Sequence, residues 1–221
     1  MTECTTDGIG FSGQGRRRVE ADFNGGAITS DAGALLLREA DRRLGLTTAL
    51  AACLSDPRDP TRITHEQVTM LRQRVFGLAL GYEDLNDHST LRDDPVFKLL
   101  GGAADGDDAL ASAPTLCRLE NRADRVSMWR MAAALVDTLI ASHGSNVPEQ
   151  LVLDFDATDD PLHGKQEGRF FHGYYDQYCF LPLYVFCGDK LLGAYLRPSN
   201  IDGAKHSWAI LALLVKRLRS V

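Results

Sequence analysis

The sequence predicts a mixed protein of the α+β or α/β class, in which a helical first part precedes a part built on strands. Apolar residues recur at intervals of three and four between about residues 30 and 142, the period of an amphipathic helix. Residues 144–148 are rich in helix-breaking types, and beyond them apolar and polar residues alternate as in a strand. We predict a flexible start with a short β ribbon at residues 1–29, a helical domain at 30–146 and a strand-containing domain at 147–221.

Composition narrows the class of protein. Hydrophobic residues make up 44% and charged residues 24% of the 221-residue chain, as in ordinary globular proteins. Neither a signal peptide nor a membrane-spanning run is apparent, so we expect a cytoplasmic protein without membrane contact. The odd number of cysteines, five without a C-x-x-C pair, favours reduced thiols over disulfides or a zinc site. The net charge of -6 means that any binding of nucleic acid must use local basic patches.

Helices are predicted where capping residues precede an apolar stripe. They cover residues 30–44, 64–81, 95–100, 114–124 and 127–142. Asp94 is predicted to cap the third, because its carboxylate can accept from the next backbone N–H groups and Pro95 suits the first helical position. The residues predicted to face the core are Leu36, Leu37, Ala40 and Leu44 in the first helix, Val68, Leu71, Val75 and Leu78 in the second, and Met128, Met131, Leu135 and Leu139 in the last.

The sequence of the second part predicts three strands and a helix. A first strand at 151–158 is followed by strands at 178–186 and 190–200, which form a hairpin around a bend at Gly188 and lie beside the first. Pro182 predicts a bulge or a sheet edge within the second strand, because proline has no N–H to donate. The closing helix, residues 204–221, is predicted to bury Trp208, Leu211, Val215 and Leu218.

Acidic residues mark the end of the first strand. Asp154, Asp156 and Thr158 are spaced by two, which places them on one face of an extended chain. Carboxylates at the end of a buried strand suit a hard divalent cation. The alternative is that both acids merely end the strand and accept from nearby backbone N–H groups. A second acidic group, Asp105, Asp107 and Asp108, is interpreted as a surface turn because the rest of a calcium-binding loop is missing.

Three long strings resemble a known family. They are GYEDLNDHSTLRDDPVFKLL, APTLCRLENR and LDFDATDDPLHGKQEGRFFHGYYDQYCFLPLYVF. Together they resemble bacterial insertion-sequence transposases of the DDE class, the group typified by insertion sequence 1380, from about Phe23 to Asn200. The resemblance implies a helical N-terminal domain that binds the transposon ends, followed by a catalytic domain of ribonuclease H-like fold. It also implies DNA partners, both transposon ends and target, and a homodimer in the complete protein.

The same resemblance assigns roles to the acids. Family members hold two divalent ions, Mg²⁺ or Mn²⁺, with an acid on the first strand, an Asp on the fourth strand and a Glu on a later helix. Asp156, in the D-x-T pattern, is implied as the catalytic and metal-binding Asp, with Asp154 as a second ligand or an orienting acid. The other two acids have no counterpart before Val221, so we expect only the first half of the catalytic fold, strand-strand-strand-helix. Such a truncated chain is expected to bind metal weakly and to be inactive alone.

Basic and polar side chains near these elements are candidate DNA contacts. They are Lys165 and Arg169 after the acids, Arg197 and Asn200 after the third strand, and Arg118 and Arg122 in the helical domain. Each has a structural alternative, a solvated loop or a turn. Phe170, Phe171, Tyr174 and Tyr175 have two interpretations, stacking on unpaired bases and ordinary strand packing.

Three functions remain as alternatives. The first is a DNA transposase that cleaves and transfers strands. The second is a non-catalytic DNA-binding or dimerising module that inhibits or assists an intact transposase. The third is another ribonuclease H-like nuclease, such as a resolvase, against which the N-terminal strings argue.

Overall fold

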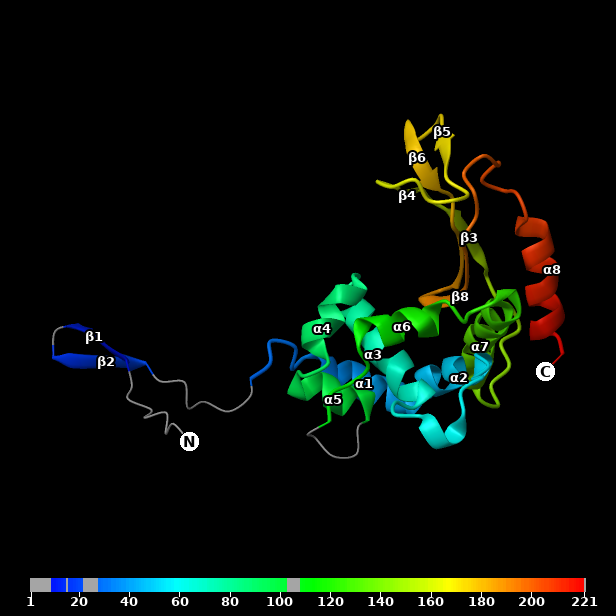
Figure 1. Cartoon of the computed structure of the whole chain (residues 1–221). Coiled ribbons are helices and arrows are strands. Elements are labelled where there is room, and N and C mark those ends of the chain that lie inside the picture. Colours follow the sequence, from blue (N-terminus) through cyan, green and yellow to red (C-terminus); the bar gives the residue numbers. More distant parts are fainter. Residues whose placement is uncertain (1–8, 15, 22–27, 103–107, 221) are drawn as a thin grey trace. The chain divides into compact units, whose positions relative to one another are not determined.

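The computed structural model describes residues 9–14, 16–21, 28–102 and 108–220 (Figure 1). The chain divides into two compact units. One comprises residues up to Ala40 together with Asp59–Leu119, and the other comprises Asp41–Arg58 together with the residues from Glu120 onward. The predicted domain limits at residues 29 and 146 stay predictions. Asp105 and Asp107 of the acidic loop lie outside the described residues.

An antiparallel ribbon opens the described chain. Strand β1 (Ile9–Gln14) pairs with β2 (Arg17–Ala21), with Phe11 opposite Val19. The pair Asn24–Gly25, a combination typical of hairpin turns, lies outside the described residues.

The first unit is helical. Its elements are α1 (Ala34–Leu44, which the unit boundary crosses), η1 (Pro60–Arg62), α3 (Gln67–Ala79), η2 (Leu85–Asp87), α4 (His88–Leu91), α5 (Pro95–Gly101) and α6 (Ala113–Glu120). Phe76, Phe97 and Leu100 lie at the centre of its core. The cap by Asp94 is confirmed: its Oδ1 accepts from the backbone N–H groups of Val96 (2.8 Å) and Phe97 (3.0 Å).

The predicted buried faces of α1 and α3 are wrong. Leu36 is 78% and Leu78 is 47% exposed. Helix α3 begins at Gln67 and buries the face that carries Met70, Gln73, Phe76 and Gly77. Gly77 lets the ring of His88 approach closely, because a Cβ there would lie 2.8 Å from His88 Cε1. Contacts distant in sequence therefore select the buried face, and the apolar period alone does not.

The second unit packs two long helices against one face of a sheet. Strands β3 (Asp154–Ala157), β7 (Leu183–Cys187) and β8 (Lys190–Tyr195) form an antiparallel sheet in the order β3-β7-β8, so the predicted hairpin beside the first strand is confirmed. Helices α7 (Arg125–His143) and α8 (Ser207–Leu218) cover it, and α2 (Leu46–Cys53) packs on α7. The core contains Val136, Leu139, Leu183, Val185, Leu192, Ile210 and Leu214.

Two predictions for these helices are wrong. Trp208 is 82% and Met128 is 56% exposed. Ile210 and Leu214 face the sheet, and Trp208 is about 200° around the helix axis from Ile210, so it points to solvent.

A second, smaller sheet stands at the end of β3, and the sequence does not predict it. Strands β4 (Asp160–Pro161), β6 (Gln177–Phe180) and β5 (Phe170–His172) pair in the order β4-β6-β5. The single strand predicted at 178–186 is in fact β6 and β7, separated by Leu181 and Pro182, where the chain leaves the small sheet for the larger one. Figure 1 shows the small sheet at one end of the larger sheet, with α8 alongside the larger sheet.

In the described part of the chain, no helix combines the length and apolar composition required to cross a membrane.

Candidate functional site

The acids of β3 lie on the solvent face of the larger sheet. Phe155 and Ala157 pack against the core, whereas Asp154 and Asp156 are exposed. Residues two apart in a strand have Cα atoms about 7 Å apart, so the two carboxylates project side by side. Asp154 pairs with Phe186 and Asp156 with Tyr184. The two aromatic rings of β7, 6.3 Å apart at their centroids, therefore lie next to the acids on the same face.

Further polar groups gather where the chain passes from β3 to β4. The N–H of Thr158 donates to the carbonyl of Pro182 (3.3 Å), which extends the pairing of β3 with β7 by one residue. The carboxylate of Asp159 accepts a hydrogen bond from the side-chain amide of Gln177 on β6. Burial raises the pKa of Tyr175, and the nearby charges of Asp159 and Asp156 raise it further. The Tyr175 hydroxyl is therefore held in its protonated form within electrostatic range of both acids.

Arg197 connects three segments at this end of the unit. Its side chain is 4% exposed; Nε donates to the carbonyl of Leu181 (2.9 Å), and Nη1 donates to the carbonyls of Gly203 (3.1 Å) and Lys205 (2.5 Å). Burial lowers the pKa of Arg197, and the Asp202 carboxylate opposes that effect. The observed contacts of Arg197 are internal ones; its predicted contact with DNA stays a prediction.

The 197–205 segment also binds both sheets. Ser199 Oγ donates to the carbonyl of Phe170 on β5 (2.8 Å), and Pro198 forms an isolated bridge with Phe180 at the end of β6. A Cβ on Gly203 would lie 3.6 Å from the Cβ of Ala157, the residue after Asp156. This segment therefore supports the strand end on which the acids lie.

The other predicted DNA contacts are dispersed. Lys165 and Asn200 are exposed in loops of the second unit. Arg169 donates to the carbonyl of Gly164, and its guanidinium carbon lies 4.6 Å from the ring centre of Tyr178. The structure thus brings Lys165 and Arg169 into one loop next to the small sheet.

Arg118 and Arg122 do not share a helical face. Arg118 lies on α6 and donates to Thr115 Oγ1 (3.0 Å), whereas Arg122 follows the end of α6 and forms an ion pair with Asp56 (2.8 Å). Hydrogen bonds, chiefly from Arg58 and also from Arg122, hold the pKa of Asp56 well below its usual range. Both arginines therefore have protein partners.

The acid pair fits part of a metal site. Asp154 and Asp156 offer exposed carboxylate oxygens, and within the described residues their side chains have no hydrogen-bond or ion-pair partner. Oxygen ligands of this kind are those that Mg²⁺ and Mn²⁺ prefer. Within the described ranges, however, no group of three His, Cys, Asp or Glu side chains is placed to hold a metal ion. By their chemistry, these two carboxylates could hold such a cation only together with further ligands.

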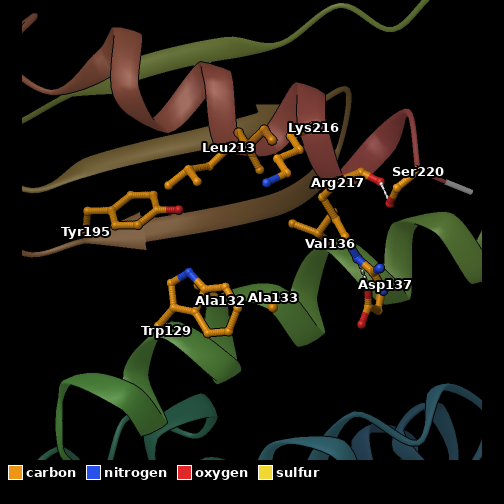
Figure 2. A pocket seen from close by; sticks show the side chains of 11 residues that line it. Trp129, Ala132, Ala133, Val136, Asp137, Tyr195, Leu213, Lys216, Arg217 and Ser220 are labelled. Carbon is orange, nitrogen blue, oxygen red and sulfur yellow. Dashed lines mark hydrogen bonds and ion pairs between the residues drawn. The ribbon is translucent and has the colours of Figure 1, made fainter.

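A separate cavity of about 540 Å³ lies on the helical side of the unit (Figure 2). Trp129 from α7, Tyr195 from β8 and Leu213 from α8 line it, and the Asp137–Arg217 ion pair lies at its edge. Helices cover the face of the sheet opposite to the acids, so this cavity is not part of the acid site.

Sequence reasoning missed three parts of the site. They are the small sheet, the Asp159–Gln177 hydrogen bond, and Tyr178, which lies with Phe171 on one face of that sheet. The alternation of apolar and polar residues around Phe171 and around Tyr178 could have indicated the two strands. Nothing in the local sequence shows that these strands pair with each other.

One protein family matches the chain. The model of the family described as transposase DDE domain group 1 matches residues 11–221. No curated protein and no solved structure matches it.

Proposed function

The chain belongs to the DDE-class transposases, in the family described as transposase DDE domain group 1, and on this premise we propose that it acts in DNA transposition by metal-dependent phosphoryl transfer. The family match over residues 11–221 carries the proposal. The exposed acid pair on β3 supports it, because this pair offers the oxygen ligands that such chemistry requires.

Asp156 is proposed as the principal metal ligand and Asp154 as the second. When bound, divalent cations neutralise charge on the scissile phosphate and activate the attacking oxygen. The chain's own part is to present the two carboxylates on a strand that β7 and the 197–205 segment hold in place. The raised pKa of Tyr175 keeps its hydroxyl protonated, so this group can donate a hydrogen bond to a phosphate oxygen.

We propose that β3, β7, β8 and α8 form the first half of a ribonuclease H-like fold. The support is their order in the chain, the antiparallel sheet order β3-β7-β8, and α8 on the sheet face opposite to the acids. The closer assignment to the insertion sequence 1380 type belongs to the same proposal.

In this proposal, the described residues supply the first-strand acid, Asp156, with Asp154 beside it, and the remaining ligands come from outside this set. The same observation favours a second candidate function. A chain with an incomplete ligand set can occupy the transposon ends without cutting and so inhibit or assist an active transposase.

DNA contacts are proposed for the exposed Lys165 and Asn200 and for Arg169. They are also proposed for Arg118, Arg122 and Arg197, provided that DNA phosphates replace the protein groups that these arginines bind in the structure. In the same proposal, the helical residues before 146 bind the transposon ends, and two copies of the complete protein act together.

The test is a strand-cleavage assay on DNA that carries the ends of the encoding element, with Mn²⁺ or Mg²⁺. The 221-residue chain and a chain extended by the following coding sequence are compared, each with Asp156→Asn. Asp189→Asn is the matched control, since it removes the same charge from the β7–β8 turn. We expect cleavage by the extended chain, its loss in Asp156→Asn and its retention in Asp189→Asn. Binding of the ends by the short chain without cleavage supports the second candidate, and cleavage that survives Asp156→Asn contradicts the proposed site.

A further inference from the structure

The two faces of the β5–β6 hairpin differ. Phe170 pairs with Cys179, Phe171 with Tyr178, and His172 with Gln177. Side chains of successive pairs point to opposite faces. Cys179 is fully buried and Gln177 binds Asp159, so the face that these residues share is directed inward on β6, whereas Phe170 on the edge strand β5 stays 41% exposed.

The opposite face presents aromatic rings to solvent. Phe171 is 52% and Tyr178 is 49% exposed, and their rings meet edge to face with centroids 5.6 Å apart. Arg169 lies against the Tyr178 ring, and its hydrogen bond to the carbonyl of Gly164 fixes it there. Two rings and a planar cation therefore form one surface, which we call the aromatic face: Arg169, Phe171 and Tyr178.

The hairpin that carries this face is joined to the acid strand. Strand β4 starts at Asp160, soon after Asp156, and pairs with β6, with Asp160 opposite Phe180. On the inward face of the hairpin, the hydrogen bond from Gln177 to Asp159 holds β6 against the same connection. The small sheet, which carries the aromatic face, is therefore attached directly to the strand on which the acids lie.

The chemistry of the face favours flat aromatic ligands. Exposed apolar side chains that are grouped in one patch, as these two rings are, are a feature of binding surfaces. Rings combined with a stacked guanidinium are the groups on which nucleobases stack. Phosphate attraction has a lesser part here, because Glu167 and Asp176 balance the charge of Arg169 and Lys165 within the same loop and hairpin.

We infer that the aromatic face binds unpaired nucleobases of a DNA strand by stacking, next to the acid pair. This inference rests on the proposed function for its substrate, since it takes that strand to be the one presented to Asp156. Single-stranded DNA is then preferred over duplex, because paired bases do not expose their faces.

The test uses the full chain and a short oligonucleotide that contains the fluorescent base 2-aminopurine, single-stranded or in a duplex. Stacking quenches the emission of this base. For Tyr178→Leu and for Phe171→Leu, we expect about tenfold weaker binding of the single strand and loss of quenching. The control is Trp208→Leu, which alters a more exposed aromatic side chain on α8; this variant is expected to bind the single strand as tightly as the unmodified chain does.

A second measurement needs no variant. An oligonucleotide with 5-iodouracil, irradiated in complex with the unmodified chain, is expected to crosslink to the segment from Arg169 to Tyr178. Crosslinks elsewhere, or unchanged affinity and quenching in both variants, overturn the inference and leave the face to a protein partner. The outcome is separable from the proposed function: Asp156→Asn is expected to abolish cleavage in the extended chain and to leave quenching intact. Quenching together with cleavage that survives Asp156→Asn refutes the acid site but not the stacking face.

Discussion

The two sheets of the second unit are built on opposite principles. The larger one buries Leu183, Val185 and Leu192, each at most 1% exposed, under two long helices. The smaller one keeps Phe171 and Tyr178 half exposed, and no helix in the described part of the chain packs extensively against it. Stability therefore resides in the larger sheet, whereas the smaller sheet leaves its side chains available for binding. The acids lie on the strand that leads from one to the other.

The largest loss of stability is expected from a substitution in the core of the larger sheet. Leu192→Ala removes a fully buried side chain and is expected to lower the free energy of unfolding by about 3 kcal/mol, because it loses apolar burial and leaves a cavity. Urea denaturation measures this. Leu196→Ala is the control, since Leu196 is 67% exposed, and a change of less than about 0.5 kcal/mol is expected there. Equal effects of the two variants would contradict the assignment of stability to the larger sheet.

The next effect concerns the junction between the sheets. Arg197→Met keeps much of the side-chain volume but leaves three carbonyl groups without their donor, and is expected to cost about 2 kcal/mol. The control is Arg217→Met, which breaks a half-exposed ion pair with Asp137 and is expected to cost about 0.5 kcal/mol. If thermal unfolding shows the same loss of stability for both variants, the hydrogen bonds of Arg197 do not stabilise the junction more than a surface ion pair would.

A smaller and local effect is expected at Ser199. Ser199→Ala removes the hydrogen bond to the carbonyl of Phe170 and is expected to cost about 1 kcal/mol. Hydrogen exchange should quicken in β5 and β6 and stay unchanged in β7, because the bond holds only the small sheet. Faster exchange throughout both sheets would show that they open as one body.

The smallest effect on stability is expected on the aromatic face. Tyr178→Leu is expected to change the free energy of unfolding by less than about 1 kcal/mol, since the ring is half exposed and loses only its contacts with Phe171 and Arg169. Chemical denaturation measures it. A loss of unfolding free energy as large as that of Leu192→Ala would show that the aromatic face is part of a structural core, and it would contradict the proposed difference between the two sheets.

The sequence predicted the elements whose signals are local. Alternation around Asp154 and Asp156 identified β3 and the shared face of its acids, and the Asp94–Pro95 pair located the start of α5. The resemblance supplied the DDE class, which the family match confirms.

What the sequence did not predict depends on contacts between distant residues. The run that contains Leu181 and Pro182 has continuous strand character, yet the chain changes sheets there, because the carbonyls of these two residues bind Arg197 and Thr158. The burial of Arg197 follows from carbonyls on segments before and after it. The outward position of Trp208 follows from the rotation of α8, which Ile210 and Leu214 set against the sheet.

The position of β3 in its sheet has a consequence for handling the protein. Among the described strands, β3 is hydrogen-bonded to β7 alone, so its other edge displays unpaired backbone groups. Charged side chains on such an edge discourage another molecule from adding a strand. We therefore expect Asp154 and Asp156 to act also as repulsive charges that keep copies of the chain from assembling edge to edge. Replacing either acid to remove activity is expected also to lower solubility, and light scattering at matched concentration will reveal it.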